Sequence, residues 1–433
     1  MIDKLYDMVA APLMLSGYRL WSIKDEKAKR FFRDREGMFE RLTKELDRHG
    51  ADERETILFH AASVGELLQA IPVMAETGRR RPDSLIVLSY TSPSVTDHMP
   101  GNVPAHIVTP SPLDTSALAG RFMDMIRPDL IVFSTYDLWP NMLFQAADRG
   151  VPVIMINAHL PASAGRLRFP ARLFHSRVYG ELHGVGAINK EDGARFSWLG
   201  VSEDLVRVTG NCRYDQTLSR CESVEDDDPD LAPMPIEGTV IIGGSVWSED
   251  LKRLLPALSG LMEEHEEVKV VLAPHEPTDS HVAEVEDYFA GLPMETERYT
   301  DLVEKERVAD ARVMVVDTVG VLYKLYKKAD LAYVGGGFRQ GVHSVMEPAG
   351  MGLPVIFGPM HDNSAEAIDM EAEGAATSVT ETGELRTALE RLIHDREKLK
   401  DMGELALGLM KRNSGATRIT TDMVEEFLAG KKP

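Results

Sequence analysis

The chain has 433 residues, more than one hydrophobic core usually supports, so we expect two domains. Its hydrophobic fraction of 43% and charged fraction of 27% are ordinary for a globular protein. A formal charge of −21 repels nucleic-acid phosphates and makes nucleic-acid binding a poor hypothesis, while Cys212 and Cys221, the only cysteines, lie in no metal-ligand spacing.

The N-terminal segment carries acids where a secretion signal has bases, because Asp3 and Asp7 flank Lys4. The apolar run from Met8 to Leu15 is interrupted by Pro12 and is too short to span a bilayer. We therefore expect a protein that is not exported by that route and does not cross the membrane.

From Thr56 onward, short apolar runs alternate with amphipathic stretches. Near-continuous apolar strands separated by helices indicate a parallel sheet that is covered on both faces. The predicted strands contain residues 57–59, 85–88, 130–133 and 153–156. These runs predict a doubly wound first domain over residues 1–221.

A basic segment follows the fourth of these strands. Residues 150–180 contain no Asp or Glu but carry Arg166, Arg168, Arg172 and Arg177 among leucines and aromatic residues. Such a segment could lie against anionic headgroups or bind a lipid phosphate. The alternative is an exposed helix whose arginines pair with acids elsewhere in the chain.

An acidic, proline-rich stretch over residues 222–237 is too polar to bury, and we interpret it as an interdomain linker. The alternation then restarts, with predicted strands at residues 240–244, 268–272, 313–316, 331–334 and 354–357. These strands predict a second doubly wound domain over residues 238–433. In such sheets, ligands bind beyond the carboxyl ends of the strands.

The most informative stretch is residues 331–359, where an apolar strand runs into Gly335, Gly336 and Gly337 and a helix is expected to start at Glu347. Glycines after a strand let backbone N–H groups approach a ligand, and the positive end of the next helix suits a phosphate. The Glu347 carboxylate beside this turn could accept hydrogen bonds from ribose hydroxyls.

Five stretches, in the same order along nearly the whole chain, resemble the 3-deoxy-D-manno-octulosonic acid (Kdo) transferases, lipid A glycosyltransferases of the GT-B class. They are His60–Glu66, Leu138–Asn141, Gly210–Asp215, Asp317–Leu322 and Val334–Glu347. The resemblance implies an α/β GT-B fold, in which two doubly wound Rossmann-like domains face a central cleft. The first domain would bind the acceptor and associate with the membrane, and the second would bind the nucleotide sugar.

The resemblance also implies an activity, partners and a location. The enzyme would transfer Kdo from CMP-Kdo to a lipid A precursor, with inversion and with neither metal nor cofactor. It would be a peripheral protein on the cytoplasmic face of the inner membrane, in lipopolysaccharide core biosynthesis. The N-terminal helix would rest on the anionic membrane surface, or it could instead pack on its own domain.

On the acceptor side, the resemblance makes Glu66 the general base that takes a proton from the attacking hydroxyl. The alternative for Glu66 is a helix-dipole role, because acids are common in the first turn of a helix. Asp137 stands where the family has Glu and would orient the acceptor. We expect Trp139 in the core rather than as a platform for a sugar. The acceptor or lipid contacts are assigned to Ser63, Arg166, Arg168 and Arg172.

On the donor side, Glu347 is expected at the ribose and a wider group at the phosphate or carboxylate. That group consists of Arg213, Ser245, His275, Gly336, Gly337 and His343. Arg213 replaces the usual Lys of the family, which keeps the charge but changes its hydrogen-bonding geometry.

The chain also departs from the family pattern at several positions. Thr135 stands in place of Glu, Ser344 in place of Asn, and an Arg is usual both near His159 and before His275. These departures bear on the substrate more than on the fold. Two alternatives therefore stay open: a GT-B enzyme with another nucleotide sugar or acceptor, and a non-catalytic lipid-binding paralogue, which the presence of Glu66 disfavours.

Overall fold

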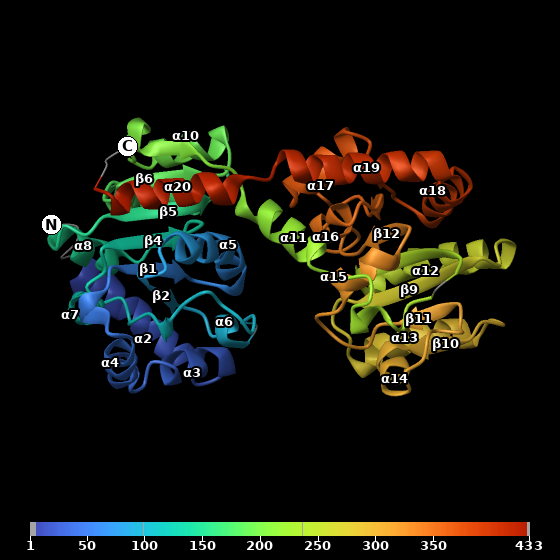
Figure 1. Cartoon of the computed structure of the whole chain (residues 1–433), viewed down its shortest axis with the longest axis horizontal. Coiled ribbons are helices and arrows are strands. Elements are labelled where there is room, and N and C mark those ends of the chain that lie inside the picture. The colour runs from blue at the N-terminus through green and yellow to red at the C-terminus, as the bar shows by residue number, and fades with distance from the viewer. Residues whose placement is uncertain (1–5, 98, 236, 431–433) are drawn as a thin grey trace. The chain divides into compact units, whose positions relative to one another are not determined.

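The computed structural model describes residues 6–97, 99–235 and 237–430, so Asp3 and Lys4 of the N-terminal segment and residue 236 of the predicted linker lie outside it. It divides into two α/β units (Figure 1). The first unit contains the described residues up to Gln216 and those from Ser414 onward, and the second contains Thr217–Asn413. Each unit holds a parallel seven-stranded sheet, which confirms the two predicted doubly wound folds.

The first sheet has the strand order β3-β2-β1-β4-β5-β6-β7. Its strands are β1 (Thr56–Ala61), β2 (Leu85–Tyr90), β3 (Ile107–Pro110), β4 (Leu130–Ser134), β5 (Val153–Ala158), β6 (Gly184–Ala187) and β7 (Val206–Val208). Every residue of β1, β2, β4 and β5 is buried, because helices cover both faces of the sheet.

The helices of the first unit separate onto the two faces. They are η1 (Tyr6–Ala10), α2 (Ala11–Trp21), α3 (Glu26–Arg33), α4 (Met38–His49), η2 (Ala51–Glu53), α5 (Val64–Arg80), α6 (Ser94–Asp97), α7 (Ser116–Ile126), α8 (Pro140–Asp148), η3 (Gly165–Leu167), α9 (Ala171–Tyr179), α10 (Lys190–Trp198), η4 (Glu203–Leu205), α11 (Cys212–Glu222), which continues into the second unit, and α20 (Ala416–Leu428). One core joins α4, α7, α8, α9 and α10 to the sheet, and the other joins α5 and α20 to its opposite face.

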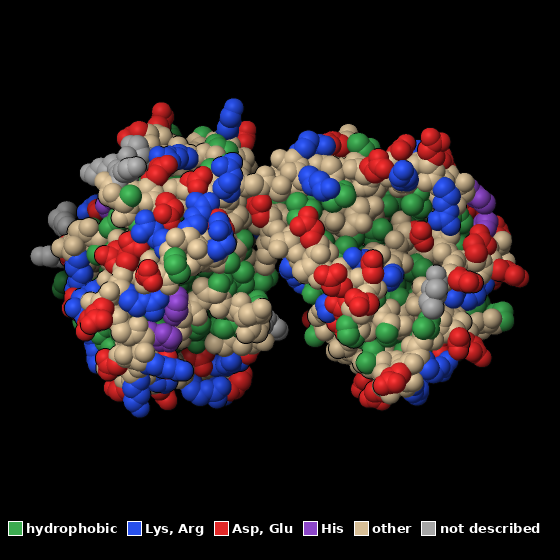
Figure 2. Space-filling view, viewed as in Figure 1, with side chains coloured by type: hydrophobic (Ala, Val, Ile, Leu, Met, Phe, Trp, Pro, Cys, Tyr) green, Lys and Arg blue, Asp and Glu red, His purple; other side chains and the backbone are tan. Residues whose placement is uncertain are grey.

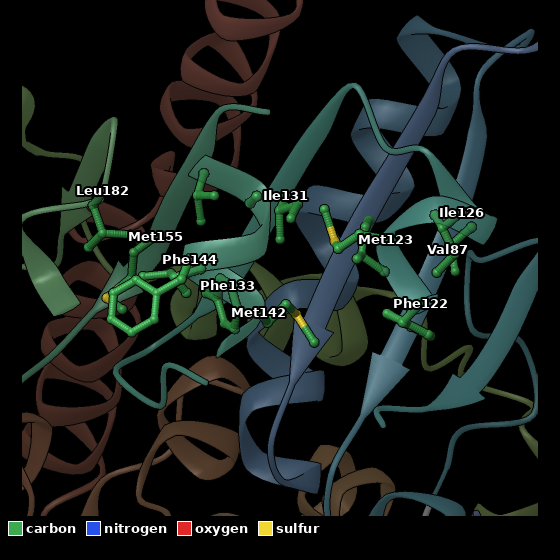
Figure 3. Close-up of a cluster of buried hydrophobic side chains, with 14 of the residues drawn as sticks. Val87, Phe122, Met123, Ile126, Ile131, Phe133, Met142, Phe144, Met155 and Leu182 are labelled. Carbon is green, nitrogen blue, oxygen red and sulfur yellow. The ribbon is translucent and has the colours of Figure 1, made fainter. Parts of the chain in front are cut away.

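Figure 3 shows part of the first of these cores. Phe122, Met123 and Ile126 of α7 gather there with side chains of β4 and α8. The labelled side chains come from strands and helices of the first unit, except Leu182, which lies in the turn between α9 and β6. This face therefore fixes the strands whose carboxyl ends carry the site residues described below.

The second sheet has the strand order β10-β11-β9-β8-β12-β13-β14. Its strands are β8 (Thr239–Val246), β9 (Val268–Pro274), β10 (Thr296–Arg298), β11 (Val313–Val315), β12 (Leu331–Val334), β13 (Val355–Phe357) and β14 (Ala376–Ser378). Its helices are η5 (Pro229–Leu231), α12 (Ser248–Glu264), α13 (Asp279–Ala290), α14 (Tyr299–Glu304), α15 (Leu322–Leu325), η6 (Tyr326–Lys328), α16 (Met346–Gly350), α17 (Ala365–Ala372), α18 (Thr382–His394) and α19 (Arg396–Arg412).

The predicted domain boundaries differ from the observed ones at both ends of the second unit. The stretch 222–237, predicted to be a linker, belongs to this unit because Val224, Leu231 and Met234 are buried in its core. The acidic residues of the stretch lie outside this core, and two of them, Asp228 and Asp230, pair with Lys324. Helix α20, the last in the chain, packs on α5 in the first unit (Figure 1).

Charged side chains are mixed over the surface that Figure 2 shows. Basic and acidic residues alternate there on both units, so the net charge of −21 does not form a single acidic patch on that face. Among the described residues, no helix is both long and apolar enough to cross a membrane.

Candidate functional site

The predicted site residues collect where the chain order of each sheet reverses. In the first sheet β1 lies between β2 and β4, and in the second β8 lies between β9 and β12. In doubly wound sheets, the loops that leave two such neighbouring strands in opposite directions open a crevice at the carboxyl edge. Glu66 and Asp137 follow β1 and β4, whereas Ser245 and Gly336 lie at the ends of β8 and β12.

Glu66 lies in the first turn of α5, which begins at Val64. Ser63 is the N-cap residue, and its Oγ accepts a hydrogen bond from the Glu66 N–H at 3.4 Å. The Glu66 carboxylate accepts from the Ala62 N–H at 2.5 Å. The side chain therefore has the position expected for a helix start, and its contribution to chemistry depends on its electrostatics.

Burial is the main influence on the Glu66 carboxyl, whose side chain is 7% exposed. It raises the pKa of Glu66 to about 8, an effect that the Ala62 N–H opposes, that Asp137 reinforces and that Arg166 opposes. A carboxyl group that exchanges its proton near neutral pH is suited to act as a general base or acid.

Asp137 and Arg166 form an ion pair beside Glu66. The Arg166 Nη2 lies 3.3 Å from Asp137 Oδ1, and its Nη1 donates to the Tyr136 carbonyl at 2.9 Å and to the Tyr179 hydroxyl at 2.7 Å. Three partners from two segments, the loop after β4 and the end of α9, hold the guanidinium in place. Arg166 therefore lies at the carboxyl edge of the first sheet, within electrostatic reach of Glu66.

Three residues other than glycine adopt left-handed backbone angles at the carboxyl edges of the two sheets. Thr135 follows β4 with φ of 70°, Asn157 lies near the end of β5 with φ of 49°, and Ser245 lies near the end of β8 with φ of 54°. For a β-branched residue such as Thr135 this conformation costs free energy, and such outliers concentrate at functional sites. Both strand edges thus carry backbone strain where the predicted site residues lie.

The other predicted arginines of the basic segment differ in their surroundings. Arg168 is exposed, and Arg172 stacks on the Trp198 ring at 3.6 Å and donates to the Trp198 carbonyl at 3.2 Å. Arg177 pairs with Glu181, so two of the four arginines of the segment do pair with acids.

Three further residues of the first unit bear on the site predictions. Trp139 packs against the core, as predicted. Arg213 lies on α11 and belongs to the first unit, unlike the other predicted donor residues. His159, where the family usually has an Arg, contacts the buried Asp192 with Nδ1 at 3.0 Å.

In the second unit, the glycine turn after β12 is tightly enclosed. A Cβ atom on Gly335 would lie 2.2 Å from the Ser245 carbonyl oxygen, and one on Gly337 would lie 2.6 Å from the Gly358 nitrogen. Gly336 has φ of 95°. Only glycine fits these positions without moving the backbone, so the turn after β12 is locked against the ends of β8 and β13.

Asp250 organises this turn and was not among the predicted site residues. Its buried carboxylate accepts from the Trp247 N–H at 3.0 Å, the Gly336 N–H at 2.8 Å and the Tyr333 hydroxyl at 3.0 Å. An acid three residues after an N-cap position is a capping-box signal, which could have indicated Asp250. This one side chain connects the loop after β8 with the loop after β12.

Two histidines predicted on the donor side come together with two residues that were not predicted, Trp247 and Arg339. The rings of His275 and His343 stack at 4.1 Å, and the Trp247 ring lies 4.6 Å from that of His275. The Arg339 guanidinium lies 4.0 Å from the Trp247 ring centroid. Arg339 is the basic residue closest in sequence to the glycine turn, and this position could have indicated it.

Glu347 lies in the first turn of α16, as predicted, but that helix has only five residues. A helix of one turn supplies little dipole, so an anion near the glycine turn would rely on loop N–H groups and side chains instead. The Glu347 carbonyl accepts from the Cys221 thiol at 3.6 Å, which connects α16 to α11.

Metal binding has no obvious place in the described part of the chain. Within residues 6–97, 99–235 and 237–430, no three His, Cys, Asp or Glu side chains are grouped so as to hold a metal ion.

The position of Glu66 predicts how stability changes with pH. In the unfolded chain the Glu66 carboxyl ionises near pH 4.5, whereas in the folded state it stays neutral until about pH 8. The free energy of unfolding therefore falls as the pH rises between these two values. We expect Glu66→Gln to raise the melting temperature at pH 8.5 and to change it less at pH 5. Each pH unit between these values contributes at most about 1.4 kcal/mol.

Thermal unfolding at both pH values checks this expectation. Glu76→Gln, on the same helix, is the matched control, because Arg79 and Arg80 lower the pKa of Glu76. This control should show no gain at high pH. The same melting temperature for Glu66→Gln and the unmodified protein at pH 8.5 would mean that Glu66 ionises normally.

Comparisons with known proteins are consistent with these features. A family model described as 3-Deoxy-D-manno-octulosonic-acid transferase (kdotransferase) matches residues 33–216. The chain is 23% identical to the 3-deoxy-D-manno-octulosonic acid transferase of Haemophilus influenzae over 428 residues, which cover 97% of each chain. It is 28% identical to the enzyme of that name from Chlamydophila psittaci over 349 residues, or 78% of each chain.

A solved structure is similar over most of the chain. The UDP-GlcNAc 2-epimerase of Neisseria meningitidis, bound to UDP-GlcNAc, aligns with a TM-score of 0.61 at 14% identity. The alignment covers 87% of this chain and 100% of the epimerase. At that identity the likeness concerns the fold alone, and it agrees with the predicted GT-B class.

Proposed function

Because the chain belongs to the 3-deoxy-D-manno-octulosonic acid (Kdo) transferase family of glycosyltransferases, we propose that it transfers Kdo from CMP-Kdo to a lipid A precursor. The observation that carries this proposal is the buried Glu66 carboxyl at the carboxyl edge of the first sheet. Its pKa of about 8 and its charged neighbours Asp137 and Arg166 suit proton transfer from a sugar hydroxyl.

In the proposed reaction, the ionised Glu66 carboxylate takes the proton of the acceptor hydroxyl. The oxygen of that hydroxyl attacks the anomeric carbon of Kdo, and the bond from this carbon to the CMP phosphate oxygen breaks with inversion. Asp137 orients the acceptor, and Arg166 holds Asp137 through their ion pair. Arg166 also favours the ionised form of Glu66, which partly offsets the effect of burial.

The departing CMP carries the negative charge that the reaction releases. In the second unit, Arg339, His343 and the backbone N–H groups of the glycine turn offer positive charge and donors for it. The Glu347 carboxylate would accept from the ribose hydroxyls. Glycine at Gly335 and Gly337 lets this turn pack against the main chain at the ends of β8 and β13, since a Cβ atom there would clash with Ser245 or Gly358.

Donor choice tests the proposal. The purified protein is incubated with a lipid A precursor and with either CMP-Kdo generated in situ or CMP-sialic acid, and CMP release is measured with and without acceptor. We expect acceptor-dependent CMP release from CMP-Kdo alone. Acceptor-dependent release from CMP-sialic acid at an equal rate, or no release from CMP-Kdo, would contradict the proposal.

Association with an anionic membrane surface is a further part of the proposal, and exposed apolar side chains support it. Leu13 and Leu20 of α2 are 67% and 70% exposed, and Phe169 beside α9 is 81% exposed. The Tyr6 ring stacks on Phe174 of α9 at 5.2 Å, so the start of the N-terminal segment packs against the basic segment. We call the exposed side chains of Leu13, Leu20 and Phe169 the N-terminal apolar face.

The N-terminal segment is also fixed to its own domain. The Tyr6 hydroxyl donates to Asp114 at 2.7 Å, and Asp7 accepts from the Ser116 N–H at 2.7 Å. Pro12 lies at the start of α2, where proline is compatible with a helix, and does not interrupt it. One side of the segment thus packs on the domain, which is the second of the two predicted alternatives, and the membrane alternative stays a proposal for the exposed side.

Anionic liposomes provide the measurement for the N-terminal apolar face. We expect the protein to co-sediment with vesicles that contain an anionic lipid and much less with neutral ones, because each Lys or Arg near such a surface contributes roughly 1 kcal/mol. The combined variant Arg168→Glu, Arg172→Glu should release the protein and raise the apparent KM for acceptor, while CMP binding stays unchanged.

The matched control changes two exposed basic residues of the second unit, Lys252→Glu and Arg391→Glu. It alters the net charge by the same amount and should leave sedimentation unchanged. If the Arg168 and Arg172 variant sediments like the unmodified protein, these arginines are an ordinary solvated face.

A further inference from the structure

The loops after β8, β9 and β12 bring together a cluster of rings that we call the Trp247 cluster: Trp247, His275 and His343, with Arg339 over the indole. His275 stacks on His343 at 4.1 Å with an angle of 12° between the ring planes. Trp247 lies against both imidazoles, with ring centroids 4.6 Å from His275 and 6.2 Å from His343. The cluster lies beside the glycine turn, because a Cβ atom on Gly336 would come within 3.0 Å of the His343 ring.

One directional hydrogen bond within this cluster determines the protonation of His343. The Trp247 Nε1–H donates to His343 Nε2 at 2.8 Å. An indole nitrogen is a donor only, so His343 Nε2 must be unprotonated in order to accept this bond. A neutral His343 then carries its proton on Nδ1.

The surroundings of His343 keep it neutral. Burial, together with the neighbouring His275, lowers the pKa of His343 to about 4. An imidazolium would also place an N–H against the indole N–H. His343 is therefore a neutral hydrogen-bond donor at physiological pH, and the donor atom is Nδ1.

The Nδ1 atom remains available for a ligand. Across residues 6–97, 99–235 and 237–430, no hydrogen bond joins His343 Nδ1 to another protein group, and the atom is not sealed from solvent. The His343 main chain is held by its own N–H, which donates to the Gly335 carbonyl at 3.0 Å. A fixed backbone, a fixed ring and one open N–H beside a glycine turn make a directional donor for an anionic oxygen.

We propose that Trp247 is a positioning residue, which holds His343 in the Nδ1–H tautomer so that this N–H donates to an anionic oxygen of the nucleotide donor. The proposal rests on the proposed function for the identity of that ligand. Trp247 acts through His343. Its indole N–H favours the Nδ1–H tautomer over the Nε2–H tautomer, because only the former leaves Nε2 free to accept the bond. With the proton on Nε2, the Nδ1 lone pair would face the anion and repel it.

Trp247 can be changed without losing its backbone role. The main-chain N–H of Trp247 donates to the Asp250 carboxylate, and this hydrogen bond does not involve the indole. Trp247→Phe therefore keeps an aromatic ring against the two histidines and the main-chain anchor, while it removes the one N–H donor. This substitution separates the proposed tautomer role from simple packing.

The first test is spectroscopic. In protein labelled with 15N only at histidine, the His343 signals are assigned by their loss in His343→Gln, and the side-chain nitrogen shifts report which atom carries the proton. We expect the Nδ1–H tautomer in the unmodified protein and a shift of the proton toward Nε2 in Trp247→Phe. Trp198→Phe, at an exposed tryptophan of the first unit, should leave the His343 tautomer unchanged.

The second test measures CMP binding by calorimetry. Loss of one hydrogen bond to a charged oxygen should weaken CMP binding about tenfold in Trp247→Phe. In His343→Asn, the amide N–H would lie near the position of Nδ1 whatever the indole does. Adding Trp247→Phe to that variant should therefore cost little further affinity, so the two effects should not add.

The outcomes separate this inference from the proposed function. The Nε2–H tautomer in the unmodified protein, or an unaltered tautomer and unaltered CMP affinity in Trp247→Phe, would overturn the role of Trp247 even if Kdo transfer is observed. Additive losses in the double variant would assign Trp247 to packing and overturn the role as well. The expected tautomers together with absent Kdo transfer would instead count against the proposed function.

Discussion

Glu66→Gln should reduce the turnover of Kdo transfer by at least about 100-fold, the effect typical of losing a general base. The substitution removes the proton acceptor but keeps the shape of the side chain, and the Gln carbonyl can still accept from the Ala62 N–H. The native fold should be retained, and CMP binding should stay close to that of the unmodified protein. Single-turnover transfer and calorimetry with CMP measure the two properties separately.

Glu76→Gln, ten residues further along α5, should retain full turnover. The Glu76 carboxylate pairs only with Arg79 and Arg80 among the described residues, away from the proposed site. In the unmodified protein, the kcat/KM should increase with pH until about pH 8, because the ionised Glu66 is the active form. If Glu66→Gln keeps half of the turnover, or if the rate is flat between pH 6 and pH 9, Glu66 only begins the helix and another group is the base.

Glu347→Ala should weaken CMP binding by about 10- to 100-fold, because a charge-assisted hydrogen bond to the ribose contributes about 1.5–3 kcal/mol. The Glu347 carboxylate has no hydrogen bond to another side chain in the described residues, so a ligand hydroxyl would not compete with an existing partner. The apparent KM for donor should rise in parallel. Calorimetry with CMP checks the affinity.

Glu347→Gln separates the acceptor oxygen from the charge, since the amide carbonyl still accepts from a hydroxyl and should lose less affinity than Ala. Glu263→Ala, at an exposed acid of the same unit, is the control for net charge. Unchanged affinity in Glu347→Ala would place the ribose elsewhere and leave Glu347 with only a role in starting α16.

The central strands were predictable because burial on both faces requires unbroken apolar runs. The runs at residues 57–59, 130–133, 240–244 and 331–334 all lie in strands. Strand β6 was not predictable in this way, because its sequence contains Gly184 and Gly186. A Cβ atom at these glycines would lie 2.8 Å from ring atoms of Phe427 and from the Thr209 hydroxyl, respectively, so glycine there reflects packing by distant residues.

Long-range packing also explains the errors in the domain boundaries. The stretch 222–237 is acidic and rich in proline, but its few apolar side chains, Val224, Leu231 and Met234, are the ones that the second core buries. The average composition of the stretch is dominated by its acids and prolines, so it does not reveal that three apolar side chains anchor the stretch in the core. The return of α20 to the first unit depends on contacts of Met423 and Val424 with α5 and the sheet, which no local pattern reveals.

The candidate site divides in the same way between local and distant information. Glu66 and Glu347 each follow a strand within a recognisable turn, so their places at the sheet edges were predictable from local sequence. The Trp247 bond to His343 joins residues 96 positions apart, and Asp250 joins Gly336 across 86 positions. Such pairings arise from the tertiary fold and give no signal in a single sequence.

The mass of the lipid product is the most direct test of the central proposal. The purified protein is incubated with a lipid A precursor and CMP-Kdo generated in situ. The mass of the lipid product is measured by mass spectrometry and compared with that from a reaction with the Glu66→Gln variant. We expect the unmodified protein to add one or more whole Kdo residues to the lipid and the variant to add almost none. A lipid whose mass is unchanged while the protein is folded and binds CMP, or one that gains a different sugar, would contradict the proposal that this chain is a Kdo transferase acting on lipid A.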